Sequence, residues 1–122
     1  MGTLDDARHV VLVCDNRGYR RDFLAEALRG YGCSVTPLAT AQEAKYYISR
    51  HGYPDLLLTD GTTASYCRND GWRLAEELRA AGRAAIVMTK EPHIDFPEVA
   101  YIRSSGTAVE VATEALSVFE ES

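Results

Sequence analysis

Five short apolar runs punctuate the chain, and in the longer ones the apolar residues are continuous rather than alternating. Residues 9–14 (HVVLVC), 55–60 (DLLLTD) and 85–89 (AIVMT) are rich in β-branched or long aliphatic side chains, and shorter runs occur at 34–38 and 99–102. A continuous apolar run of this length is typical of a strand that is buried on both faces. The pattern therefore predicts five strands.

Stretches with apolar residues every three or four positions separate these runs. The first predicted helix ends at Gly32. The second begins after Thr40, which can cap it with Glu43 as the capping-box partner, and Gly52 closes it. Two more helices are predicted over residues 72–81 and 109–119. The apolar stripe of the first helix is Phe23, Leu24, Ala27, Leu28 and Tyr31.

Alternating strands and helices predict an α/β fold, because right-handed crossovers build a parallel sheet with helices on both faces. We expect the flavodoxin-like strand order 2-1-3-4-5. One connection is too short for this plan. Between the fourth and fifth strands, residues 90–98 remain, and they contain Pro92 and Pro97. A helix needs more residues and excludes proline from its interior, so this helix is predicted to be missing or shortened.

Length and composition indicate one domain over residues 1–122, with one packed core. The net charge of -5 argues against direct DNA binding, which favours a basic surface. No apolar run approaches the ~20 residues of a membrane span, and residues 1–9 carry no signal-peptide pattern. An odd set of cysteines, with no metal-site spacing, fits a reducing cytoplasm. These cysteines are Cys14, Cys33 and Cys67.

Polar residues follow four of the predicted strands. Asp15 and Asn16 come after the first strand, Asp60 ends the third, Thr89 ends the fourth and Arg103 follows the fifth. In this sheet type, ligands bind beyond the carboxyl ends of the strands. Carboxylate and amide oxygens suit Mg²⁺, and a carboxylate beside such an ion can attack a phosphoryl donor. Any one of these residues could merely mark a strand reaching the surface; the combination points to a phosphoryl-transfer site.

At these positions the sequence resembles the response-regulator receiver (CheY-like) family of two-component signalling. The similarity runs without a gap from Val10 to Gly32 and continues at residues 40–44 (TAQEA), 54–60 (PDLLLTD) and 71–74 (GWRL). It covers nearly the whole chain. The resemblance implies a receiver domain that accepts a phosphoryl group and is not a turnover enzyme.

The resemblance also implies a role for each matching residue. Asp60 would accept the phosphoryl group from a histidine kinase or phosphotransfer protein, and Thr89 and Arg103 would bind that group. The implied Mg²⁺ ligands are Asp15, Asn16, Asp60 and the backbone carbonyl of Thr62.

Several positions depart from the family pattern. Asn16 stands where the family has a second acid, so weaker Mg²⁺ binding is expected. Arg103 replaces a lysine, keeping the charge in a larger, planar group. Lys90 follows Thr89 where the family has a small residue, and the loop after Asp60 is longer than usual. These changes favour an atypical receiver or pseudo-receiver.

Two functions stay open from the sequence. The first is a phosphorylated receiver that switches an output domain, a partner or a homodimer. The second is a pseudo-receiver that works without phosphorylation. It would bind a protein or a phosphate-bearing nucleotide such as cyclic di-GMP through the exposed surface of the last two strands. The candidate ligand residues there are Arg79, Arg83, Tyr101 and Arg103.

Three other features have more than one interpretation. Arg17, Arg20 and Arg21 form either a basic spot near the acid pocket or an ordinary charged helix start. Trp72 is expected to pack the loop after the third strand or to contact a partner. His93, in the proline-bearing segment, is expected to be solvated.

Overall fold

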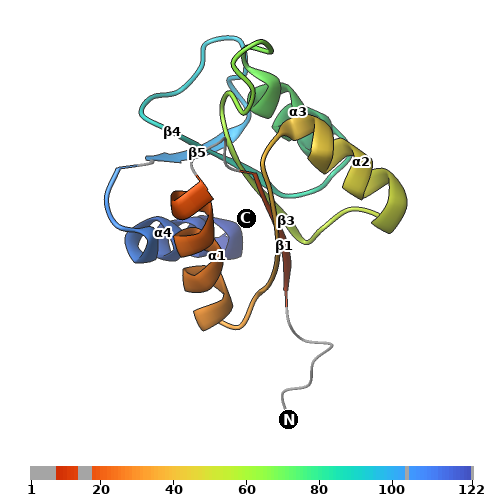
Figure 1. The fold of residues 1–122 in the computed structure, drawn as a ribbon. Coiled ribbons are helices and arrows are strands. Elements are labelled where there is room, and N and C mark those ends of the chain that lie inside the picture. The colour runs from red at the N-terminus through yellow and green to blue at the C-terminus, as the bar shows by residue number, and fades with distance from the viewer. Residues whose placement is uncertain (1–7, 14–17, 104, 122) are drawn as a thin grey trace.

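A five-stranded parallel sheet forms the centre of the molecule, in the order β2-β1-β3-β4-β5 (Figure 1). The computed structural model describes residues 8–13, 18–103 and 105–121. All four neighbouring strand pairs are parallel, which confirms the predicted flavodoxin-like sheet. The strands are β1 (His9–Val13), β2 (Ser34–Leu38), β3 (Leu56–Asp60), β4 (Ala85–Thr89) and β5 (Ala100–Arg103).

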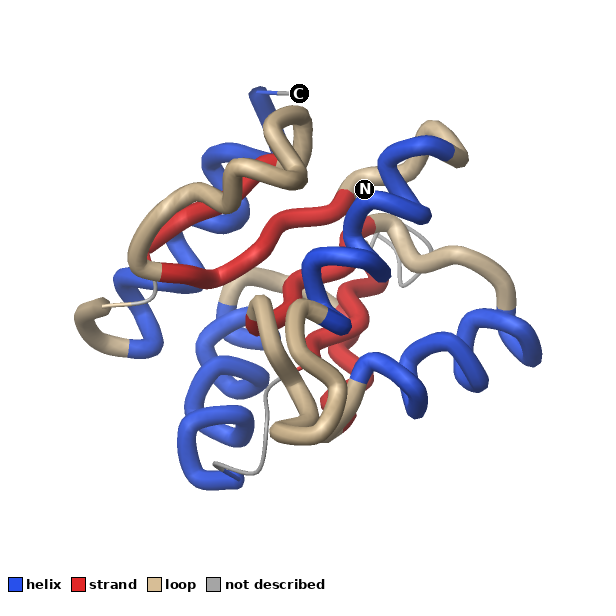
Figure 2. The backbone as a smooth tube through the Cα atoms, turned by 90° about the horizontal axis from the view of Figure 1, so that it is seen from above, coloured by secondary structure: helices blue, strands red, loops and turns tan. Residues whose placement is uncertain are grey.

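Helices cover both faces of this sheet (Figures 1 and 2). The described residues form α1 (Gly18–Gly30), α2 (Ala41–His51), α3 (Asp70–Ala80) and α4 (Ala108–Glu121). Helices α1 and α4 pack side by side on one face, and α2 and α3 pack on the other. None of the helices in these described ranges has the length and apolar character of a transmembrane segment.

The strand residues alternate between two hydrophobic cores. On β3, Leu56 and Leu58 belong to the core under α1 and α4, whereas Leu57 belongs to the core under α2 and α3. All three are fully buried, which explains why this strand is apolar without alternation. The same alternation directs Asp60, two residues after Leu58, toward the α1 face of the sheet.

Capping boxes begin two of the helices. At α2, the Thr40 hydroxyl accepts the Glu43 N–H at 3.1 Å, and the Glu43 carboxylate accepts the Ala39 N–H at 3.0 Å, as the sequence predicts. The Thr107–Glu110 pair does the same for α4. The hydrogen bonds from Thr107 lower the pKa of Glu110 below its usual range. Each box satisfies amide groups that the first helical turn leaves unpaired.

Only part of the apolar stripe of helix α1 is buried in the core. Leu24, Ala25 and Leu28 are buried, but Phe23 is 60% exposed and Tyr31 is 54% exposed. The Tyr31 hydroxyl is 2.8 Å from the Thr113 hydroxyl of α4. The apolar spacing therefore identifies the helix, but the buried face is narrower than the apolar pattern and leaves out Phe23 and Tyr31.

The connection between β4 and β5 contains turns and no helix, as its length and prolines predict. Phe96 in this connection stacks on Trp72 of α3, with ring centroids 5.8 Å apart and an interplanar angle of 13°. His93 meets the Trp72 and Phe96 rings edge-on. The expectation that His93 is solvated is wrong, since its side chain is 23% exposed and packs against aromatic rings.

Candidate functional site

Three of the predicted site residues end neighbouring strands at the same edge of the sheet. Asp60 ends β3, Thr89 ends β4 and Arg103 ends β5. In the strand registers, Asp60 pairs with Met88, and Thr89 pairs with Arg103. We call this edge the carboxyl edge. The predicted residues Asp15 and Asn16 lie outside the described residues.

An arginine from α1 is paired with the Asp60 carboxylate. The Nη1 atom of Arg20 donates to Oδ1 of Asp60 at 3.1 Å, while Nη2 lies 3.9 Å from the Met88 sulfur. The side chains of Arg20 and Asp60 are only 21% and 15% exposed. Since water screens a partly buried pair less than a surface pair, this attraction is stronger than that of an exposed salt bridge.

The position of Arg20 on α1 explains why it reaches the carboxyl edge. Arg20 lies four residues before Leu24 and eight before Leu28, so it shares their inward face. It stands in the first turn of α1, where the helix dipole disfavours a positive charge. The carboxylate of Asp60 offsets that cost. Of the two interpretations left open for this basic cluster, the structure places Arg20 at the acid site.

Two glycines hold the backbone of Asp60 against the start of α3. The Gly61 carbonyl accepts the N–H groups of Gly71 and Trp72 at 2.9 and 3.2 Å. A Cβ at Gly71 would collide with the Asp60 carbonyl oxygen, and one at Gly61 would lie 2.6 Å from Nε1 of Trp72. Only glycine permits this close approach. The end of β3 and the first turn of α3 are therefore a tightly packed unit.

The loop after Asp60 is fixed by a chain of hydrogen bonds. The carboxylate of Asp70 accepts the backbone N–H and the hydroxyl of Thr63, both at 2.6 Å. The Thr63 oxygen in turn accepts the Ala41 N–H at 2.7 Å, which links the loop to the start of α2. The Thr62 hydroxyl accepts the Asn69 N–H at 2.9 Å. This network defines the loop that carries the Thr62 carbonyl.

The remaining carboxyl-edge residues are more open to solvent. The Thr89 hydroxyl donates to the Glu91 carbonyl at 3.1 Å, within its own connection. Arg103 and Lys90 are exposed. By strand alternation, Thr89 and Arg103 belong to the face opposite that of Ile102, which lies in the α1/α4 core. Asp60 and Arg20 lie on the α1 face instead, so Thr89 and Arg103 share the strand ends with Asp60 but not its face.

Two of the predicted Mg²⁺ ligands, Asp60 and the Thr62 carbonyl, lie in the described ranges. Asp60 supplies a carboxylate, and the Thr62 carbonyl lies in the loop that follows. The described residues contain no group of three or more histidine, cysteine, aspartate or glutamate side chains that could hold a metal ion. The ion pair with Arg20 shows that Asp60 accepts a cation here. The donor chemistry thus fits a hard cation such as Mg²⁺, in competition with Arg20.

Several solved structures with a similar fold are receiver domains. A CheY-like receiver from Methanospirillum hungatei JF-1 superposes with a TM-score of 0.74 and 18% identity, covering 95% of this chain and 96% of the other. This chain has the receiver-domain fold. A receiver from a histidine kinase of Syntrophus aciditrophicus gives a TM-score of 0.73 at 17% identity, covering 94% of this chain and 92% of the other.

A receiver domain solved in an activated form is also similar in fold to this chain. The beryllofluoride-activated NtrC receiver domain gives a TM-score of 0.71 at 20% identity and covers 95% of this chain and 97% of the other. No protein-family model matches the sequence, and no curated protein matches it. The similarity to receiver domains therefore lies in the fold.

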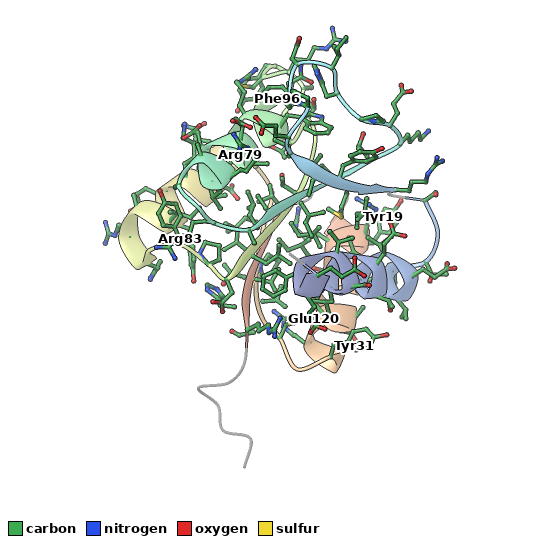
Figure 3. The ribbon with its side chains drawn as sticks, turned by 180° about the vertical axis from the view of Figure 1, so that it is seen from behind. Tyr19, Tyr31, Arg79, Arg83, Phe96 and Glu120 are labelled. Atoms are coloured by element: carbon green, nitrogen blue, oxygen red, sulfur yellow. The ribbon has the colours of Figure 1, made fainter. Side chains whose placement is uncertain are left out.

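The four residues of the alternative ligand surface lie in two separate places. Arg79 and Arg83 line a cavity of about 190 Å³ beside Ala100, at the start of β5 (Figure 3). Arg103 lies three residues further along this strand, about 10 Å away. Acidic side chains already pair with Arg79: Glu76 at 2.6 Å and Glu98 at 4.0 Å. The hydrogen bond from Arg79 also lowers the pKa of Glu76.

The contacts of Arg83 and the exposure of Tyr101 do not converge on one site. Arg83 packs over the Tyr53 ring, with its guanidinium carbon 4.9 Å from the ring centroid. Tyr101 is 42% exposed on β5. Drug-sized ligands usually occupy cavities of about 300 Å³ or more. This surface therefore does not gather its arginines around one nucleotide-sized site.

Proposed function

We propose that this chain is a receiver domain of two-component signalling, with Asp60 as its phosphoacceptor. The observation that carries the proposal is the position of Asp60. Its carboxylate ends the central strand β3, is 15% exposed, and lies 3.1 Å from a guanidinium. An acceptor needs a nucleophilic oxygen in reach of a donor and positive charge beside it. The receiver fold supports the same proposal.

The proposed reaction transfers one phosphoryl group from a phosphohistidine donor. A carboxylate oxygen of Asp60 attacks phosphorus, the P–N bond breaks, and its electron pair stays on the imidazole nitrogen. The product is an acyl phosphate on Asp60, so the domain is an acceptor and not a turnover enzyme. Thr89 and Arg103, at the ends of the next two strands, are the proposed contacts for its phosphoryl oxygens.

We also propose Mg²⁺ as a weakly held cofactor, bound by Asp15, Asn16, Asp60 and the Thr62 carbonyl. When bound, the metal neutralises negative charge on the transferring group. The donor partner would be a histidine kinase or a phosphotransfer protein. The recipient of the signal would be an output domain, another protein or a second copy of this chain.

Nuclear magnetic resonance with beryllofluoride tests the proposal. The ¹⁵N-labelled chain is titrated with beryllofluoride in millimolar Mg²⁺, and the Asp60→Asn variant serves as the control. We expect shifts centred on Asp60, Gly61 and Thr89 in the parent and none in the variant. A second arm treats both proteins with phosphoramidate and measures the mass gain of one phosphoryl group. An unchanged parent spectrum and mass would contradict the proposal.

A further inference from the structure

We propose that Arg20 is a positioning and phosphoryl-binding residue of the Asp60 site, and that it carries part of the charge neutralisation otherwise supplied by a divalent metal. The inference rests on the proposed phosphoacceptor function. Its first support is the ion pair, in which the Arg20 guanidinium lies 3.1 Å from Oδ1 of Asp60. One arginine of the basic cluster at the start of α1 therefore lies directly at Asp60.

The Arg20 guanidinium contacts two neighbouring strands. Its Nη1 atom donates to the Asp60 carboxylate of β3, and its Nη2 atom lies 3.9 Å from the sulfur of Met88 on β4. Asp60 and Met88 are partners in the strand register. The guanidinium thus spans the ends of β3 and β4 on the α1 face. Its side chain is 21% exposed, so it keeps contact with the solvent from which a donor arrives.

The charges explain what this arrangement does during transfer. An incoming phosphoryl group is negatively charged, and so is the Asp60 carboxylate. A guanidinium at the carboxylate reduces their repulsion. The acyl phosphate product carries more negative charge and more acceptor oxygens than the carboxylate. Arginine binds such a group through several charge-assisted hydrogen bonds, so Arg20 is expected to hold the product more strongly than the free acid.

The same contact makes Arg20 a competitor of Mg²⁺ in the resting state. A metal ion that binds Asp60 has to displace or share the contact with a guanidinium that is largely buried. Removing the positive charge should therefore tighten Mg²⁺ binding to the free protein. It should also weaken binding of a phosphoryl mimic when Mg²⁺ is scarce. These opposite effects distinguish a role at the acceptor from a purely structural ion pair.

Arg20→Gln tests this inference, with Arg20→Lys as a charge-preserving variant. Arg29→Gln is the matched control, because Arg29 lies on the same helix but contacts the Val35 carbonyl instead. The chain has one tryptophan, Trp72, whose indole lies against Gly61, so its fluorescence can report binding at the neighbouring Asp60. Mg²⁺ is titrated alone, and beryllofluoride is then titrated at low and high Mg²⁺.

We expect Arg20→Gln to bind Mg²⁺ about threefold to tenfold more tightly, and to bind beryllofluoride about tenfold more weakly at low Mg²⁺. Arg20→Lys should lie between the parent and Arg20→Gln, and Arg29→Gln should match the parent. Beryllofluoride binding by Arg20→Gln that equals or exceeds the parent's overturns the inference alone. No response to beryllofluoride in any form, by fluorescence or by magnetic resonance, overturns the proposed function and this inference together. Thermal unfolding confirms that each variant is folded.

Discussion

At the scale of single residues, the candidate site depends on two glycines without side chains as much as on its charged groups. Gly71 lets the first turn of α3 approach the Asp60 carbonyl oxygen, where a Cβ has no room. Gly61 lets the Trp72 ring lie directly over the backbone next to Asp60. Neither glycine has a positive φ, so their role is space rather than backbone freedom. The position of Asp60 is thus set partly by two missing side chains.

Gly71→Ala is expected to destabilise the fold by about 2–3 kcal/mol, because the added methyl group overpacks the β3–α3 contact. Urea unfolding followed by circular dichroism measures this change. The control is Gly30→Ala, since a Cβ at Gly30 meets nothing within 4 Å. Its stability should stay the same or rise by up to about 1 kcal/mol. Equal stability of Gly71→Ala and the parent would show that the β3–α3 contact is loose.

At the scale of elements, the connection between β4 and β5 contains no helix but still covers an apolar side chain of α3. Phe96 and His93 cover the Trp72 ring, which is 4% exposed at the start of α3. The backbone N–H of Trp72 donates to the Gly61 carbonyl, one residue after Asp60. The connection therefore contacts the region around Asp60 through α3 as well as through Thr89. Figure 3 labels Phe96, which is part of this connection, above α3.

Phe96→Ala should therefore cost about 2–3 kcal/mol of unfolding free energy and shift Trp72 fluorescence to longer wavelength. Truncation removes the stacked ring and admits water to the indole. Ile94→Ala is the matched control in the same connection, because Ile94 is 90% exposed and its loss should change neither quantity. Identical fluorescence in both variants would mean that Phe96 does not shield Trp72 in solution.

At the scale of the whole molecule, the two edges of the sheet are protected differently. Edge strand β2 is packed by α1 and α2, and Pro37 removes one amide donor from it. Edge strand β5 is packed by α4 on one face, while Tyr101 and Arg103 on the opposite face are exposed. The missing helix between β4 and β5 is the reason. Strand β5 is therefore covered by fewer helical side chains than strand β2.

Hydrogen exchange should reveal this asymmetry. We expect the β5 amides to exchange at least about tenfold faster than those of β2, because local opening costs less where fewer apolar groups are buried. Both are edge strands, so the comparison isolates the effect of helix cover. Mass spectrometry of peptides spanning residues 34–38 and 100–103 measures the rates. Slower exchange in β5 than in β2 would contradict this account.

The sequence alone determined the elements and the residues that share the carboxyl edge. Apolar runs and helical spacing depend on near neighbours in the chain, so five strands and their helices were predictable, and the short segment with Pro92 and Pro97 excluded a helix. Parallel strands end at one edge, which placed Asp60, Thr89 and Arg103 there. The roles of these three in phosphoryl transfer stay predictions.

Only the tertiary structure decided which distant side chains meet. Arg20 and Asp60 are 40 positions apart, and their pairing depends on how α1 docks on β3. The contact of Phe96 with Trp72 depends likewise on where a turn-rich segment folds back. The exposure of Phe23 and Tyr31 was not predictable for the same reason, since apolar spacing predicts a helix but not the width of its buried face. Docking angles arise from packing the whole core, and no local pattern encodes them.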